Sequence, residues 1–160
     1  MIVGYGTSVP ADRFRTAVAV YGVVQASGRI LLMRRAGSGY HDGELSLPAG
    51  RIEGGEDVTS ALTRELAEEL TIAVDPAACR LGVVVHRAAE SSTDHEYLDL
   101  FFIVPSWTGD PAIGEPTKCS ELVWADPGQL PPDVIPYVQK ALTALDAGQP
   151  LVLDGWTTTG

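Results

Sequence analysis

Three glutamates fall within one turn of a predicted amphipathic helix that spans residues 58 to 70. An apolar residue recurs at every fourth position of this segment, and the resulting stripe should pack against the rest of the chain. The stripe consists of Val58, Leu62, Leu66 and Leu70. At about 100° per residue, Glu65 and Glu69 lie within roughly 20° of Val58, and Glu68 lies about 80° to one side. We therefore expect these carboxylates to lie beside the core.

Carboxylates crowded beside an apolar face repel one another and lose hydration. Without compensation, their pKa values would rise or the helix would be destabilised. A divalent cation removes both costs, because Mg²⁺ takes oxygen ligands, keeps several waters and often shares its coordination with substrate phosphates. Mn²⁺ can take its place, whereas Zn²⁺ favours nitrogen and sulfur ligands. The cluster predicts a magnesium site, and the alternative is a solvated acidic helix face.

The residues around this helix resemble the Nudix box of the Nudix (MutT-like) hydrolase family, Gly-x5-Glu-x7-Arg-Glu-U-x-Glu-Glu-x-Gly-U, where U is a bulky aliphatic residue. The matching residues are Gly50, Glu56, Arg64, Glu65, Leu66, Glu68, Glu69 and Ile72. Thr71 stands where the family usually has glycine, and Ala49 replaces another frequent glycine before the box. The motif itself covers residues 47 to 72, and the wider likeness covers roughly residues 15 to 145.

The resemblance implies an α/β fold, a Nudix-type α/β/α sandwich with a mixed β-sheet. It implies hydrolysis of a diphosphate linkage in a nucleoside diphosphate derivative, with Mg²⁺ as the cofactor and water as the nucleophile. The implied metal ligands are the carboxylates of Glu65, Glu68 and Glu69 and the main-chain carbonyl of Gly50. Catalytic roles are implied for Glu65, Glu69 and Arg64.

Two further residues of the box should support the metal ligands. Arg64 and Glu56 are expected to lie around the carboxylates, where a guanidinium keeps the glutamates ionised and oriented. The alternative for Arg64 is an ordinary surface ion pair along the helix.

Many members of the family recruit one more glutamate from a loop near residues 114 to 126, as a metal ligand or as the general base. Glu115 precedes Pro116 in a segment that could move over a substrate. Glu121 begins a strand that leads to Trp124. We expect Glu115 to be the catalytic residue, and an ordinary surface position is the alternative for either glutamate.

Two consecutive arginines and a glycine-rich loop are expected to meet the substrate. Arg34 and Arg35 follow a predicted strand, where many members of the family carry a substrate-facing arginine. Side chains alternate along a strand, so only one of the two can point inward, and the sequence leaves open which. The loop 37–44 carries Tyr40 and His41, which could stack on a base or lie exposed on the surface.

The remaining elements should form the sheet and a second helix. Strands are expected at residues 17–24, 29–33, 45–49, 81–87 and 97–104, with the first two forming a hairpin. Apolar residues at helical spacing predict a final helix over residues 134–145. Asp133 before this helix could bind a base edge or cap the helix. The triplet Leu151 to Leu153 could add an edge strand or contact a second copy of the chain.

Composition favours one domain. The chain has 160 residues, of which 45% are hydrophobic and 20% charged. We expect an N-terminal extension at 1–14, the Nudix domain at 15–146 and a tail at 147–160. The net charge of −10 argues against a long nucleic acid as partner. No apolar run could span a membrane, and no signal peptide is evident, so a cytoplasmic protein is expected.

The substrate follows by elimination within the family. The interval before the box has Gly39 and Tyr40 where the coenzyme A subclass carries an arginine. Markers for ADP-ribose or dinucleoside polyphosphates are missing near Arg87 and Ala89. A nucleoside triphosphate or related nucleotide is the expected substrate. The alternatives are a nucleotide-sensing domain without turnover, and an isopentenyl-diphosphate isomerase, for which Cys79 and Cys119, two expected free thiols, lie in unsuitable surroundings.

Overall fold

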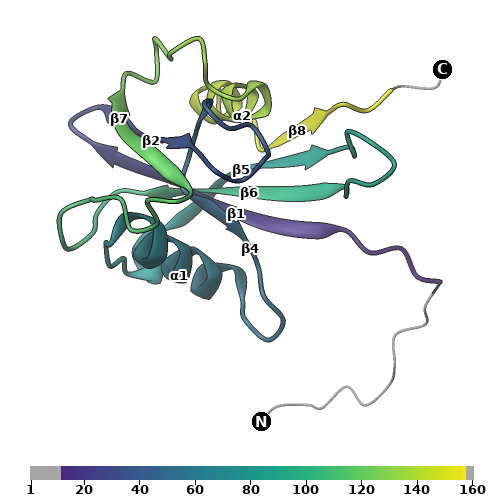
Figure 1. The fold of residues 1–160 in the computed structure, drawn as a ribbon, viewed down its shortest axis with the longest axis horizontal. Coiled ribbons are helices and arrows are strands. Elements are labelled where there is room, and N and C mark those ends of the chain that lie inside the picture. The colour runs from purple at the N-terminus through teal and green to yellow at the C-terminus, as the bar shows by residue number, and fades with distance from the viewer. Residues whose placement is uncertain (1–11, 158–160) are drawn as a thin grey trace.

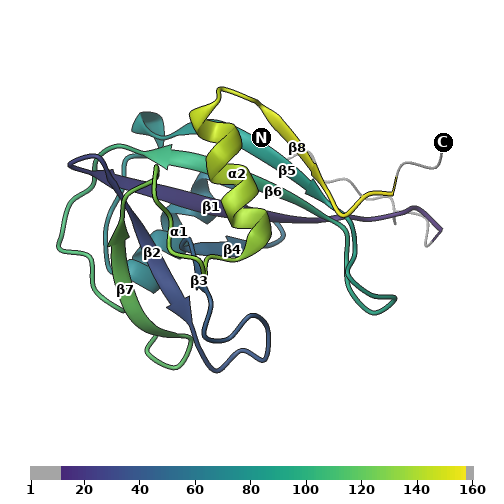
Figure 2. The ribbon, with the colours of Figure 1, turned by 90° about the horizontal axis from the view of Figure 1, so that it is seen from above.

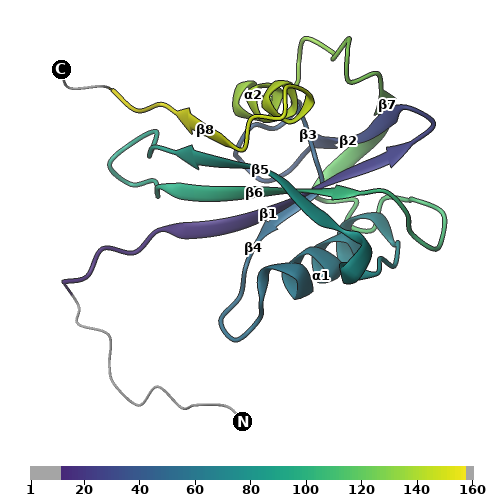
Figure 3. The same ribbon diagram turned by 180° about the vertical axis from the view of Figure 1, so that it is seen from behind.

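A computed structural model describes residues 12–157, so the expected N-terminal extension lies almost entirely outside the described residues. A mixed β-sheet lies between two helices, with one helix on each face (Figures 1 and 3). This arrangement confirms the predicted α/β/α sandwich. No helix within residues 12–157 is long and apolar enough to span a membrane.

Four strands precede the first helix, and three strands, the second helix and a final strand follow it. The strands are β1 (Ala17–Ala26), β2 (Arg29–Arg35), β3 (Leu45–Ser46), β4 (Ala49–Arg51), β5 (Arg80–Arg87), β6 (Tyr97–Val104), β7 (Cys119–Ala125) and β8 (Leu151–Asp154). The helices are α1 (Val58–Leu70), a short 3₁₀ turn η1 (Pro76–Ala78) and α2 (Pro136–Asp146).

Strand β1 is the centre of the sheet (Figure 2). The strand order is β3-β2-β1-β6-β5-β8, with β4 also paired to β1 and β7 to β2. β1 runs parallel to β6 and antiparallel to β2 and β4. The predicted hairpin of β1 and β2 is confirmed, and its turn residues Ser27 and Gly28 both have positive φ, 51° and 72°, as a tight two-residue hairpin requires.

Side-chain alternation along β1 divides the core into two halves. Ala19, Tyr21 and Val23 belong to the half covered by α2, and Val20 and Val24 belong to the half covered by α1. The predicted apolar stripe of α1 packs there, since Leu62, Leu66 and Leu70 are 1% exposed or less. Each helix is therefore fixed to the sheet by its apolar face.

Both ends of α1 lie where the sequence predicts them, and the departure from the Nudix box falls at its C-terminal end. The Asp57 carboxylate caps the helix by accepting hydrogen bonds from the backbone N–H groups of Thr59 and Ser60. Thr71 follows the last helical turn with φ 58° and ψ 27°, the left-handed conformation that glycine adopts without strain. The chain thus makes the family's turn with a β-branched residue.

The structure corrects two of the predicted elements and decides two questions that the sequence left open. The expected strand 45–49 is two strands, because β3 pairs with β2 and β4 pairs with β1, with Leu47 and Pro48 between them. Helix α2 begins at Pro136, not at residue 134, and its N-cap is Ile135, so Asp133 does not cap it. The tail segment adds the edge strand β8, which pairs in parallel with β5. Cys79 and Cys119 are both free thiols, as expected.

Candidate active site

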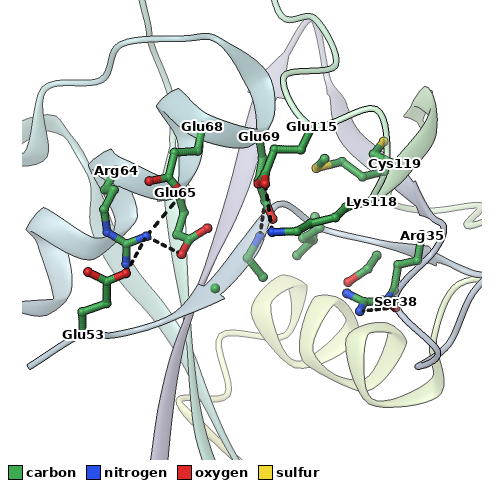
Figure 4. A pocket seen from close by; sticks show the side chains of 15 residues that line it. Arg35, Ser38, Glu53, Arg64, Glu65, Glu68, Glu69, Glu115, Lys118 and Cys119 are labelled. Carbon is green, nitrogen blue, oxygen red and sulfur yellow. Dashed lines mark hydrogen bonds and ion pairs between the residues drawn. The ribbon is translucent and has the colours of Figure 1, made fainter.

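A cavity of ≈430 Å³ opens between α1, β4 and the loop 105–118, which joins β6 to β7 (Figure 4). Charged side chains from distant parts of the chain line it. The acidic residues are Glu53, Glu65, Glu68, Glu69 and Glu115, and the basic residues are Arg35, Arg64 and Lys118. All four glutamates expected at the site, from α1 and the loop, therefore face one space.

Helix α1 supplies three of these carboxylates because the cavity adjoins its apolar face. Side-chain exposure is 12% for Glu65 and 50% for Glu68, so the stripe-side position expected from helical spacing holds for Glu65. Gly50 allows the close approach of β4 to the helix, since a Cβ atom there would lie 2.0 Å from the carboxyl carbon of Glu65. Only glycine fits at this position without displacing the glutamate.

Arg64 binds the surrounding carboxylates, which fits the supporting role expected for it. Its Nη2 and Nε donate to the two carboxylate oxygens of Glu56 at 2.6 and 3.0 Å, a bidentate pairing. Its Nη1 donates to Glu65 at 2.7 Å and lies 3.4 Å from Glu68. Nη2 also donates to the Arg51 carbonyl at 3.2 Å. This network is more extensive than a single surface ion pair along the helix.

Glu69 is the most deeply placed carboxylate of the cluster. Its Oε2 accepts a hydrogen bond from the backbone N–H of Ala49 at 2.8 Å. Burial raises its pKa to about 8, the nearby Glu65 and Glu115 carboxylates add to that rise, and the Ala49 hydrogen bond opposes it. Burial also raises the pKa of Glu65, with Arg64 acting in the opposite direction. The site thus holds an excess of negative charge that a cation would stabilise.

The loop 105–118 brings Glu115 to the cavity by binding the C-terminal end of α1. The Gly114 N–H donates to the Glu69 carbonyl at 2.9 Å, and a Cβ atom on Gly114 would lie 2.0 Å from the Glu68 carbonyl oxygen. Glu115 forms an ion pair with Lys118 at 2.8 Å. Sequence reasoning missed Gly114 and Lys118, although a glycine directly before the candidate glutamate was a usable signal.

The two arginines that end β2 have different surroundings. Arg35 lines the cavity, and its Nε donates to the Tyr40 carbonyl at 2.9 Å. Arg34 forms ion pairs with Glu121 at 2.7 Å and Asp133 at 2.6 Å. The structure therefore places Glu121, Arg34 and Asp133 together and apart from the carboxylate cavity. A substrate-binding role for Arg34 and Asp133 stays a prediction.

A second cavity of ≈400 Å³ continues from the first, and Arg35, Ser38, Ala49 and Gly50 line both. Its other walls are mainly tyrosines and arginines. They are Ala19, Tyr21, Tyr40, Arg51, Arg87, Asp94, Tyr97 and Tyr137. Tyr40, a candidate from the sequence, lies here, whereas Arg87, Tyr97 and Tyr137 were missed. Side-chain alternation could have identified Arg87, because it lies on the same inward face of β5 as Val83 and Val85.

The donor set of the first cavity suits a hard divalent cation. Its available ligands are carboxylate oxygens, together with main-chain carbonyls near Gly50, which is the chemistry that Mg²⁺ and Mn²⁺ prefer. Within residues 12–157, no three acidic, imidazole or thiol groups already converge into a cation cage. Arg64 holds Glu65 and Glu68 in ion pairs, so these side chains must turn inward to share one ion.

Comparisons with known proteins agree with this geometry. The family model for the NUDIX domain matches residues 13–145. The 8-oxo-dGTP diphosphatase of Escherichia coli K12 is 28% identical over 130 residues, 77% of this chain and 93% of that protein. A Bacillus subtilis protein provisionally given the same name is 33% identical over 126 residues, 79% of this chain and 76% of its own length. A crystal structure of a MutT NUDIX hydrolase from Burkholderia pseudomallei matches with a TM-score of 0.73 at 26% identity, covering 81% of this chain and 98% of that chain.

Proposed function

Because this chain belongs to the NUDIX family and is a MutT-like hydrolase of that family, we propose that it hydrolyses a diphosphate linkage of a nucleoside triphosphate or related nucleotide with the help of Mg²⁺. One observation carries the proposal. Glu65, Glu68, Glu69 and Glu115 face the same cavity as Arg35 and Lys118. Carboxylates that can bind a metal ion and basic side chains that can bind phosphate oxygens therefore line the same cavity.

The carboxylates of Glu65, Glu68 and Glu69, with the carbonyl of Gly50, would hold the ion. When bound, Mg²⁺ or Mn²⁺ supplies neutralisation of the phosphate charge and a lowered pKa for a coordinated water. Arg64 keeps the ligand carboxylates oriented through its hydrogen bonds to Glu56 and Glu65.

The other charged groups of the cavity act on the substrate directly. Glu115 lies on the loop 105–118, and its carboxylate can accept the proton of the attacking water. Arg35 and Lys118 can donate hydrogen bonds to non-bridging phosphate oxygens, where negative charge grows as the leaving phosphate departs. The tyrosine-lined second cavity then receives the nucleoside part of the substrate, since it continues from the first.

The names of the relatives suggest which compounds to test first as substrates. The Escherichia coli relative is named for 8-oxo-dGTP, an oxidised nucleoside triphosphate. We include this compound with ordinary nucleoside triphosphates, sugar nucleotides and dinucleotide cofactors in one panel. Products identified by mass spectrometry would show which diphosphate bond is cleaved.

The decisive comparison is between the wild-type protein and Glu69→Gln in Mg²⁺, in Mn²⁺ and in EDTA. We expect turnover by the wild type with either metal and at least a ~100-fold loss in the variant. Asp110→Asn, at an exposed site outside the cavity, is the matched control and should keep wild-type turnover. A wild-type protein that binds nucleotides but releases no product from any compound would instead be a nucleotide-sensing domain.

A further inference from the structure

A buried arginine in the wall of the second cavity has no part in the diphosphate chemistry described above. Arg87, the last residue of β5, is only 4% exposed, and its guanidinium still lines this cavity. A buried charge is costly unless it is paired and hydrogen-bonded, so such a residue needs a structural or functional explanation.

The guanidinium is held rigidly from three sides. Its Nε donates to Oδ2 of Asp99 at 2.9 Å in a buried ion pair. Its guanidinium carbon lies over the rings of Tyr97 and Tyr137, 4.3 and 4.2 Å from their centroids. Its Nη1 donates to the Tyr40 hydroxyl at 3.2 Å. A fixed guanidinium presents its remaining donors in one direction only.

Nη2 is the guanidinium nitrogen that donates to no residue in the described part of the chain. None of the hydrogen bonds among residues 12–157 uses it. Asp99 Oδ1 is the one fully buried side-chain nitrogen or oxygen without a partner in that part of the chain. Because Nη2 also lacks a partner there yet is not among the fully buried atoms, it reaches the open cavity. Its N–H groups can therefore donate hydrogen bonds to a ligand.

The surroundings favour a neutral acceptor over a further anion. The Asp99 carboxylate already offsets the charge of Arg87 at 2.9 Å. Burial raises the pKa of Asp99, and the hydrogen bond from Arg87 opposes that rise. The tyrosines among its walls give the cavity a partly aromatic lining, which suits a nucleobase ring carrying a carbonyl. A ring amino group at the same place would set donor against donor.

Resting on the proposed function, we propose that Arg87 is a specificity-determining residue whose Nη2 donates to a ring carbonyl of the nucleobase. The substrates would be nucleotides with a carbonyl at the base edge, such as a 6-oxopurine or a 4-oxopyrimidine, in preference to the matching 6-amino or 4-amino compounds. Asp99 and Tyr40 are positioning residues, because they act through Arg87.

The test uses two substrate pairs that differ mainly in carbonyl against amino group, ITP with ATP and UTP with CTP. The wild type should show at least a ~10-fold higher kcat/KM for the carbonyl member of each pair. IMP with AMP and UMP with CMP, measured by calorimetric binding without turnover, should show the same order of affinity. Wild-type ratios within threefold of one in both pairs would overturn the proposal.

Variants then locate the effect. Arg87→Met/Asp99→Val removes the buried ion pair as a unit, which avoids an unpaired buried charge, and should bring both ratios to within threefold of one. Arg80→Met is the control, since Arg80 is an exposed arginine on the same strand that lines neither cavity, and it should keep the wild-type ratios. A double variant that keeps them would overturn the assignment to Arg87.

The two proposals fail in different ways. If no triphosphate is hydrolysed but IMP still binds at least ~10-fold tighter than AMP, the proposed hydrolysis of triphosphates is wrong and the role of Arg87 stands. If hydrolysis proceeds at equal efficiency for carbonyl and amino bases, the role of Arg87 is wrong and the hydrolysis stands.

Discussion

Raising the pH should destabilise the metal-free protein, and Glu69→Gln should remove much of that loss. Glu69 has a pKa of about 8 in the folded protein, against an ordinary value of 4.5. Below pH 4.5 the carboxyl is protonated in both the folded and the unfolded state, so the folded state bears no cost. Between pH 4.5 and 8 the unfolded chain releases this proton and the folded chain keeps it, so stability falls as pH rises. Above pH 8 the loss is complete.

The size of the effect follows from the pKa change. A rise from 4.5 to about 8 corresponds to at most about 5 kcal/mol, at about 1.4 kcal/mol per pH unit. The Glu69 side chain keeps some contact with water in the cavity, which weakens its interaction with Glu65 and Glu115. We therefore expect about 2 to 3 kcal/mol between pH 5 and pH 8.5.

Urea unfolding in EDTA measures this directly. The free energy of unfolding of the wild type should fall by about 2 to 3 kcal/mol more than that of Glu69→Gln between the two pH values. Asp110→Asn, which removes an exposed carboxylate, should follow the wild type. Excess Mg²⁺ at pH 8.5 should restore the wild type and have less effect on the glutamine variant, because binding to the folded state adds stability.

Parallel pH profiles would refute this reasoning. If the wild type and Glu69→Gln lose the same stability from pH 5 to pH 8.5 in EDTA, Glu69 is not a buried carboxylate with a raised pKa. A wild type that becomes more stable over this range relative to the variant would reverse the sign and would place the carboxylate in a stabilising ion pair.

Three further predictions concern single positions. Gly50→Ala should lower kcat at least ~10-fold in a nucleotide hydrolysis assay, because its Cβ would lie 2.0 Å from the Glu65 carboxyl carbon, and unchanged turnover would contradict the close packing. Thr71→Gly should raise the free energy of unfolding by about 0.5 to 1 kcal/mol in urea, since Thr71 has φ 58°, and a loss of stability would show that the turn is unstrained. Glu115→Gln should lower kcat at least ~100-fold while Glu121→Gln stays within twofold, and equal losses would disprove the assignment of the base.

The sequence predicts α1 well because several local signals coincide there. The four-residue apolar stripe and the box spacing both define the same segment, and the helix spans Val58–Leu70 with Asp57 as its N-cap. Helix α2 was placed two residues early, because apolar periodicity continues through Val134 and Ile135 although Pro136 sets the start. Local chemistry decides helix ends, and hydrophobic spacing alone does not.

The inward arginine could not be chosen from the sequence because its direction depends on a partner strand. β2 pairs with β7, and the register shifts between Arg34 and Arg35. The two side chains still alternate along β2, and their surroundings decide which one is inward, because Arg34 pairs with Glu121 on β7 and Arg35 lines the cavity. In the same way, the position of Glu115 depends on hydrogen bonds between a loop and the distant end of α1, such as that from Gly114 to Glu69.

Buried charges in the second cavity were open to inference from the sequence and were overlooked. Asp99 lies at the inward parity of β6, between Tyr97 and Phe101, as Arg87 does in β5. Two opposite charges at inward positions of adjacent strands predict a buried pair. Their meeting across the sheet follows from the β5–β6 register, which places Val85 opposite Asp99 and Arg87 opposite Tyr97.

The parallel pairing of β1 with β6 leaves one edge of the central strand unpaired during much of the synthesis of the chain. Ala17 lies opposite Tyr97 and Val24 opposite Val104, so about half the length of the chain separates β1 from its parallel partner β6. On the ribosome, the nascent chain holds an apolar strand with one open edge until β6 emerges, which exposes it to aggregation and to chaperones. Glu115 and Lys118 follow later still, so even a released fragment ending at β6 would carry the complete box and no complete site.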